Sequence, residues 1–317
     1  MAASREQHRM LYKIAHAYYF DELTQQQIAN RFRLSRPKVS RLLQEARAEG
    51  VVDIILVPPS GGLADLEREL EQRYDLDEAV VVSVSNSRDL ASVKRELGPA
   101  AAECLIRSLT GDEVVAVAWG MSILAMVDAL PFKSMPDVTV VQSNGGLGPV
   151  DEREHSFELT RRVAQKLGAR FRLLQAPGVV STRAAAQVLK SDRQIADTLA
   201  LAARADVAVV GLGLLRPDTL LLREGTILTE EDVETLEEAQ AVGDVALRYL
   251  DADGVPIDLD INERTIGLTL EQVKKIPRVM GIAGGEEKLD IIRATLRGGI
   301  LDVLVTDDCA ARELLAH

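Results

Sequence analysis

The sequence is poor in cysteine, histidine and aromatic residues. Of 317 residues, two are cysteines, four are histidines and 3% are aromatic. Cys104 and Cys309 lie far apart in the sequence, so we expect reduced thiols rather than a disulfide or a metal pair. The histidines have no ligand spacing, and no zinc site is predicted.

Long apolar runs are also missing. No uninterrupted run approaches the roughly 18 residues of a membrane-spanning helix, and the N-terminal MAASREQHRM lacks the apolar core of a signal peptide. We therefore expect a cytoplasmic protein. With 47% hydrophobic and 27% charged residues, the chain has the composition of a folded protein that is long enough for two domains.

Charge is unevenly divided along the chain. Residues 1–50 contain nine Lys/Arg and five Asp/Glu, a net charge of +4, whereas the whole chain carries −12, which leaves −16 for the remainder. Because an acidic body repels DNA, this division favours nucleic-acid binding by the N-terminal part alone.

Residues 24–50 are typical of a helix-turn-helix. Thr24 and Gln27 have capping-box spacing and predict the start of a helix. Arg33 and Leu34 are expected to form the turn, after which Ser35 would cap a second helix. An earlier apolar repeat, from Leu11 to Tyr19, predicts a supporting helix, so the unit is expected to be at least trihelical.

The second helix of this pair has a basic side. Val39, Leu42, Leu43 and Ala46 repeat at helical spacing and are expected to face inward. The opposite side has residue types that reach bases and phosphates in a major groove, although any small bundle can have a basic solvated face. The residues predicted to contact double-stranded operator DNA are Gln25, Ser35, Arg36, Pro37, Lys38, Ser40 and Arg41.

The N-terminal domain is expected to end near residue 57. The apolar run 51–57 predicts a short strand or wing, and PPSGG at 58–62 predicts a linker. This gives a helix-turn-helix domain at 1–57 and an effector and oligomerisation domain at 58–317. A helix with Leu63, Leu66 and Leu70 on one side follows, and this side either packs on its own domain or dimerises.

From residue 77 onward, strand and helix patterns alternate. Seven apolar runs are candidate strands: 78–84, 113–119, 137–143, 170–175, 206–212, 278–284 and 301–307. Helical patterns lie between them, for example at 90–109, 157–167, 230–239 and 286–296. This order predicts an open, doubly wound α/β domain with a mainly parallel sheet.

Ligands of such domains bind at the carboxyl ends of the strands. Four candidate strands are followed by small polar segments, namely WGMS, SNGGLG, GLG and AGGEEK. Glycine allows close backbone approach and helix N-termini attract anions, so these segments resemble a phosphate cradle to which Lys288 adds positive charge. Alternatively, each glycine pair forms a tight turn and Glu286 and Glu287 stabilise a helix end. No segment matches a dinucleotide or Walker motif, so neither NAD nor ATP is expected, and no cofactor is predicted.

Two further candidates have alternative roles. Arg264 could fork onto phosphate or sugar hydroxyls, or could form a surface ion pair with Glu263. Asp307 and Asp308 could accept sugar hydroxyls, or could cap the final helix.

Motifs along nearly the whole chain resemble the SorC family of sugar-responsive bacterial transcriptional regulators. They are LTQQQIANRFRLSRPKVSRLLQEARAEGVV, AWGMS, VVQSNGG, DADGVPID through ERTIGLTLEQVKKIPRVMGIAGGEEK, and LRGGILDVLVTDDCAARELL. The resemblance implies an effector domain similar to glucosamine-6-phosphate deaminase and ribose-5-phosphate isomerase, a sugar or sugar-phosphate effector, and dimers or tetramers on DNA.

The predicted effector residues are those that match these motifs or end the last candidate strand. They are Gly120, Ser122, Asn144, Gly145, Gly146, Arg264, Gly284, Gly285, Lys288 and Asp307. The main functional hypothesis is a regulator whose DNA affinity the effector controls. Alternatives are a sugar-phosphate isomerase or deaminase with an appended helical unit, and an adaptor that assembles through the Leu63–Leu70 helix.

Overall fold

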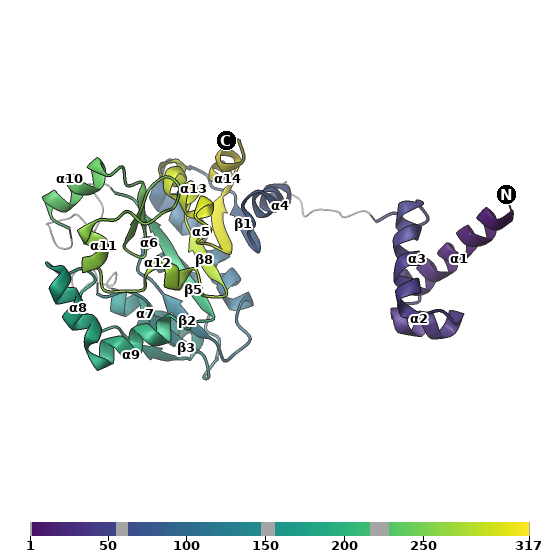
Figure 1. Ribbon diagram of the computed structural model, residues 1–317, viewed down its shortest axis with the longest axis horizontal. Coiled ribbons are helices and arrows are strands. Elements are labelled where there is room, and N and C mark those ends of the chain that lie inside the picture. Colours follow the sequence, from purple (N-terminus) through teal and green to yellow (C-terminus); the bar gives the residue numbers. More distant parts are fainter. Residues whose placement is uncertain (1, 55–62, 147–155, 216–227, 317) are drawn as a thin grey trace. The chain divides into compact units, whose positions relative to one another are not determined.

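The computed structural model describes residues 2–54, 63–146, 156–215 and 228–316 (Figure 1). The chain divides into two compact units, Met1–Pro59 and Ser60–His317. The predicted domain boundary at 57/58 and the PPSGG segment lie outside the described residues. Each unit is therefore described by itself.

The N-terminal unit is trihelical, with α1 (Ala2–Tyr19), α2 (Gln25–Phe32) and α3 (Arg36–Ala48). Thr24 and Gln27 form the predicted capping box at the start of α2. Apolar side chains from all three helices pack together, including Ile14, Ile28 and Val39, each with none of its surface exposed. The predicted inward stripe of α3 is confirmed at Val39, Leu43 and Ala46, which are buried.

The turn between α2 and α3 differs in detail from the prediction. Arg33 ends α2 in a left-handed conformation with φ of 54°. Ser35 occupies the N-cap position of α3, but its side chain makes no capping hydrogen bond. Within residues 51–54 no strand forms; Val51 and Val52 instead pack beside Leu11 and Ala46.

The second unit is built on a sheet in the order β1-β9-β8-β5-β2-β3-β4, parallel along this path. The strands are β1 (Glu78–Val82), β2 (Val114–Val117), β3 (Thr139–Gln142), β4 (Arg170–Arg172), β5 (Val207–Gly213), β8 (Val279–Ile282) and β9 (Val303–Asp307). All seven candidate strands are confirmed. Central strands such as β8 and β9 are buried throughout, because helices cover both faces.

The sequence did not predict a short antiparallel pair, β6 (Gly243–Val245) and β7 (Arg248–Leu250), in which β6 extends the end of β5. Three-residue strands are too short to show alternation. This pair places Asp244 beside Gly213, at the carboxyl end of β5.

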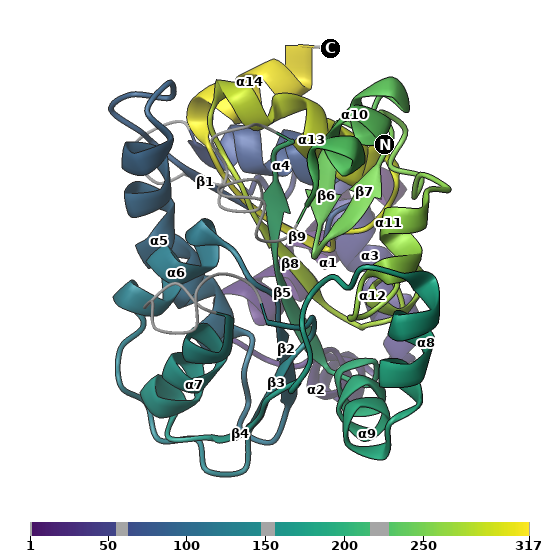
Figure 2. The same ribbon diagram turned by 90° about the vertical axis from the view of Figure 1, so that its left-hand side faces the viewer.

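Helices cover both faces of the sheet (Figure 2), with α5, α6 and α7 on one side and α8, α9 and α13 on the other. The helices of this unit are α4 (Leu63–Tyr74), α5 (Leu90–Arg107), α6 (Met121–Ala129), α7 (Ser156–Leu167), α8 (Arg183–Ser191), α9 (Arg193–Ala202), α10 (Glu230–Glu238), α11 (Asp260–Arg264), α12 (Leu270–Val273), α13 (Leu289–Arg297) and α14 (Asp308–Ala316). A 3₁₀ turn, η2 (Glu286–Lys288), precedes α13. The doubly wound α/β prediction is confirmed.

The helix α4 belongs to the core of this unit. Leu70 is fully buried, and Leu63 and Leu66 pack against the same core. Packing on its own domain is therefore an observed role of this side. Among the described helices, none is long and apolar enough to cross a membrane.

Candidate functional site

The predicted DNA face lies on the outward side of α3 and its N-terminal turn. Ser35, Arg36, Pro37, Lys38 and Arg41 are exposed, whereas Gln25 and Ser40 are half-buried. The charged groups among them are available to a nucleic acid, and the buried stripe of α3 holds the helix against α1 and α2.

A surface hollow of about 670 Å³ lies beside this face, lined in part by Thr24, Gln25, Gln26 and Arg36. The start of α2 presents backbone N–H groups and Arg36 adds a guanidinium. Both are groups that contact DNA phosphates.

The predicted effector segments follow neighbouring strands. Gly120 and Ser122 follow β2, Asn144–Gly146 follow β3, Gly284 and Gly285 follow β8, and Asp307 ends β9. The strands β9, β8, β5, β2 and β3 are consecutive in the sheet. Parallel strands end at one edge, so all these segments lie along the same side of the sheet.

The glycines at these strand ends differ in how much space surrounds them. A Cβ at Gly145 would lie 2.2 Å from the carbonyl oxygen of Pro177, and one at Gly284 would lie 2.4 Å from Asp307 Oδ2. Gly120 differs, because a Cβ there would meet only ordinary contacts, the nearest at 3.6 Å from the Cα of Gly211.

Lys288 extends from η2 into the interior, where it is 8% exposed. Its Nζ donates a hydrogen bond to the carbonyl oxygen of Leu212, at the end of β5. Burial, together with the nearby charge of Lys94, lowers the pKa of the Lys288 ammonium to about 8, and Asp244 opposes this shift. The charge predicted for the anion cradle is thus present, but it lies within the protein.

Asp244 faces this lysine from β6. Burial raises the pKa of the Asp244 carboxyl to about 6, against the opposing effects of a 2.8 Å hydrogen bond from the Leu247 amide and of Lys288. The side chain also fills the space at Gly213, where a Cβ would lie 1.9 Å from Asp244 Oδ1. Sequence reasoning missed Asp244; the available signal was a single carboxylate within the apolar segment AVGDVALRYL.

Asn144 contributes an unsatisfied donor. The residue is 1% exposed, and its Nδ2 has no hydrogen-bond partner in the structure as described, whereas its Oδ1 accepts from the Ser143 hydroxyl at 3.2 Å. A buried, unpaired amide costs about 1–3 kcal/mol. A ligand oxygen that accepts from this donor would remove that cost.

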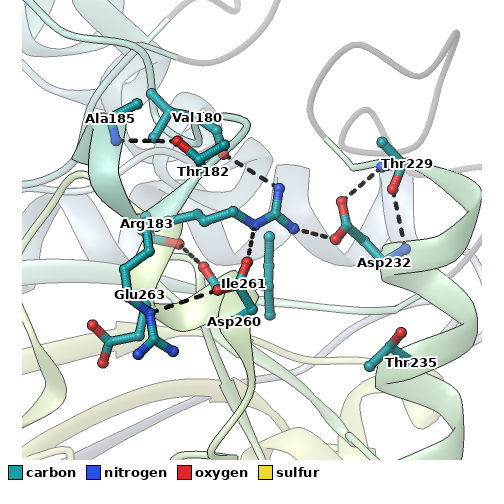
Figure 3. Close-up of polar contacts among 12 residues, drawn as sticks. Val180, Thr182, Arg183, Ala185, Thr229, Asp232, Thr235, Asp260, Ile261 and Glu263 are labelled. Carbon is teal, nitrogen blue, oxygen red and sulfur yellow. Dashed lines mark hydrogen bonds and ion pairs between the residues drawn. The ribbon is translucent and has the colours of Figure 1, made fainter. Parts of the chain in front are cut away.

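Arg264 is buried among carboxylates rather than exposed on the surface. Its guanidinium pairs with Asp232 of α10 and, at 2.8 Å, with Asp260 of α11, and it donates to the carbonyl oxygen of Val180 at 3.2 Å. Figure 3 shows Asp232 and Asp260 approaching from these two elements. The alternative prediction, a surface ion pair between Arg264 and Glu263, is wrong. Within the described residues, Arg264 forms its ion pairs with the two aspartates. Its role as an effector ligand stays a prediction.

Asp307 and Glu286 have clear structural roles. Asp307 accepts from the amide of Gly285 at 2.6 Å and from that of Ala310 at 3.0 Å, so it caps α14 as the alternative proposed. Glu286 pairs with Arg88 at 3.1 Å. This contact directs its carboxylate toward the segment that precedes α5.

A basic helix-turn-helix unit and an α/β unit with ligand-type strand ends define a ligand-responsive transcriptional regulator. A family model described as "Putative sugar-binding domain" matches residues 59–316. The chain is 33% identical over 311 residues to the deoxyribonucleoside regulator of Bacillus subtilis, covering 98% of each chain. It is 34% identical over 308 residues to the transcriptional regulator LsrR of Enterobacter sp. (strain 638), covering 96% of this chain and 92% of that one.

A solved structure extends this likeness to both units. The full-length sorbitol operon regulator SorC from Klebsiella pneumoniae matches with a TM-score of 0.74 at 28% identity, covering 98% of this chain and 99% of that one. The chain belongs to the SorC family of sugar-responsive transcriptional regulators, which confirms the resemblance found in the sequence.

Proposed function

We propose that α3 binds operator DNA and that a sugar or sugar phosphate binds at the carboxyl ends of β2, β3, β5 and β8, thereby changing the affinity for DNA. The observation that carries this proposal is the row of glycine and polar segments on consecutive strands, with the buried Lys288 and the unpaired amide of Asn144 within it. A cation and an amide donor are the groups that recognise phosphate and hydroxyl oxygens.

We further propose a non-enzymatic role in the cytoplasm. The described relatives are transcriptional regulators. Lys288 and Asp244 are paired with backbone groups, not arranged as a free acid and base. Chromatographic assays of sugar-phosphate turnover test this part of the proposal, and any catalysed conversion would contradict it.

Coupling between the units follows from linkage. An effector shifts DNA affinity only by the difference in its binding free energy between DNA-competent and DNA-incompetent arrangements. Helix-turn-helix proteins bind two half-sites as pairs, so we propose a homo-oligomer in which the effector changes the spacing of two DNA-binding units.

A thermal-shift screen with matched pairs of sugars or polyols and their phosphates tests the ligand class. The names of two relatives refer to deoxyribonucleosides and to a sorbitol operon, so the panel includes deoxyribose, sorbitol and their phosphates. Stabilisation by phosphorylated members alone supports the anion cradle. Stabilisation by free sugars alone contradicts a phosphate role for Lys288, and hits are then tested on duplexes selected from random DNA.

A further inference from the structure

The outward side of α1 has an aromatic stripe that the DNA and effector sites do not use. Tyr12, His16 and Phe20 follow one another at four-residue spacing. The Tyr12 and His16 ring centroids are 6.0 Å apart, and those of His16 and Phe20 are 5.2 Å apart and stacked. Four-residue spacing aligns side chains along one face of a helix.

This stripe is exposed. Tyr12 is 58% and Phe20 80% exposed, the latter the highest value among the exposed large hydrophobic residues of the described chain. The opposite side of α1, with Leu11 and Ile14, is fully buried against the other two helices. The stripe is therefore a second apolar face, on a helix whose first face already packs in the core.

The rings are held in place before any partner arrives. His16 Nδ1 lies 3.2 Å from Asp21 Oδ1, and its ring stacks on Phe20. Ordered aromatic side chains lose little conformational entropy on binding, which is why they are enriched at the centres of protein interfaces.

We propose that this stripe is the contact between the DNA-binding units of two copies of this chain, with the two α1 helices antiparallel about a two-fold axis at His16. This register sets Tyr12 opposite the partner's Phe20 and His16 opposite the partner's His16. An isologous contact requires such self-complementarity.

Charge along α1 favours the same register. The exposed Arg9 lies on the same side of α1, seven residues before His16, and the exposed Glu22 follows the end of the helix. Antiparallel pairing about His16 brings Arg9 within one helical turn of the partner's Glu22, whereas parallel pairing would place like charges together. Because the core separates α1's stripe from the basic side of α3, that side of α3 stays open in the pair.

The small size of the proposed contact between the two α1 helices limits its strength. Three side chains on one helix cover much less than the roughly 1,200–2,000 Å² of a stable interface. The contact is therefore weak between separate chains and forms where the second units already hold two copies together, at a high effective concentration. To this extent the inference depends on the homo-oligomer proposed above, and sedimentation of the full chain tests that oligomer separately.

Disulfide trapping in the full-length protein tests the contact without DNA or effector. With Cα atoms about 2.3 Å from each helix axis, axes about 8–10 Å apart place facing Cα atoms roughly 3.4–5.4 Å apart, which overlaps the range of about 4.4–6.8 Å that a disulfide needs. His16→Cys is compared with Ala48→Cys, an exposed position on α3, both in a Cys309→Ser background that leaves the buried Cys104.

We expect His16→Cys to form a covalent dimer on the order of tenfold faster than Ala48→Cys under mild oxidation. Mass spectrometry is expected to find position 16 linked to position 16. Equal rates in an oligomeric protein would overturn the proposal, as would a link from position 16 to Cys104, since either result means that the stripe does not face its own copy.

Charge reversal supplies a second test in the His16→Cys background. Arg9→Glu is expected to slow trapping by about two- to fivefold, and the added change Glu22→Arg is expected to restore it. A double variant that remains as slow as Arg9→Glu contradicts the antiparallel register. Phe20→Ser, which removes a side chain that is 80% exposed, is expected to slow trapping without unfolding the unit.

Discussion

Lys288 donates a hydrogen bond from Nζ to the carbonyl oxygen of Leu212 and thereby joins the turn after β8 to the end of β5. The buried ammonium of Lys288 thus binds the backbone of a neighbouring strand, and Asp244 lies close enough to raise the pKa of this ammonium. Its role in ligand binding has to be separated from this structural role.

Lys288→Met is expected to abolish the thermal shift produced by a phosphorylated ligand while leaving DNA affinity unchanged. The charge that attracts the phosphate is lost, whereas α3 lies in the other compact unit. The exposed Lys275→Met is the matched control and should retain the full ligand shift. A normal dose response in Lys288→Met would exclude the lysine from the effector site.

Asp244 should make stability depend on pH. Its folded pKa of about 6 lies above its ordinary value of 3.8, so its contribution to stability is complete below about pH 4 and is lost as the pH rises through 6. Two pKa units correspond to about 3 kcal/mol. Urea unfolding should show that wild-type stability falls by up to this amount relative to Asp244→Asn between pH 4 and 7. Parallel profiles for the two proteins would contradict the buried, titrating carboxyl.

Arg41→Ala should weaken specific DNA binding by about 1–3 kcal/mol if its guanidinium reads a base edge. Titration of a duplex selected by the wild-type protein, at fixed salt, measures the effect. Arg68→Ala, an exposed arginine of α4 in the other unit, is the matched control. If Arg41→Ala bound DNA with wild-type affinity, the prediction that Arg41 belongs to the recognition face would be wrong.

Gly120→Ala and Gly145→Ala should separate a ligand-facing glycine from a structural one. A Cβ at Gly120 makes ordinary contacts only, so stability should change by less than about 1 kcal/mol while effector binding weakens. A Cβ at Gly145 collides with the backbone of Pro177, and this variant should be destabilised even without ligand. Thermal unfolding with and without effector distinguishes them; unchanged effector affinity in Gly120→Ala would argue against close approach at that strand end.

Arg264→Met should destabilise the second unit by about 3–5 kcal/mol, because the carboxylate of Asp232, 13% exposed, would lose its cationic partner. Asp260 is 61% exposed in its side chain, so Asp260→Asn should cost less than about 1 kcal/mol. The double variant Arg264→Met, Asp232→Asn should recover part of the loss in chemical unfolding. Equal losses of stability in Arg264→Met and Asp260→Asn would show that burial does not decide the energetics of this cluster.

The sequence predicted the elements whose signals are local. The capping box at Thr24, the stripe of α3 and all seven parallel strands have periodicity or end signals that operate within a few residues. The hairpin of β6 and β7 was missed because three-residue strands show no period. Asp244 was missed with it, since only the fold brings this carboxyl beside Gly213 and Lys288.

The lack of long-range information in a single sequence also explains why the partners of Arg264 were not predicted. Its expected partner was a neighbour in sequence, Glu263, whereas the structure supplies Asp232 from 32 positions away, a residue that also caps α10. Long-range pairs of this kind depend on how the helices pack, which single-sequence patterns do not encode. For Lys288, the sequence correctly predicted a position after a strand. It did not predict that the side chain is buried, because burial too depends on how the elements pack.

The close packing at Gly98 has a mechanical consequence for the candidate effector site. A Cβ there would lie 2.5 Å from the carbonyl oxygen of Ala125, so the backbones of α5 and α6 are in direct contact. The residues Leu90 and Val93 of α5 adjoin Gly285, and α6 begins at the strand end that holds Gly120. Because close-packed elements transmit displacements to one another, we expect a ligand that moves the turn at Gly285 to move the strand end at Gly120 as well.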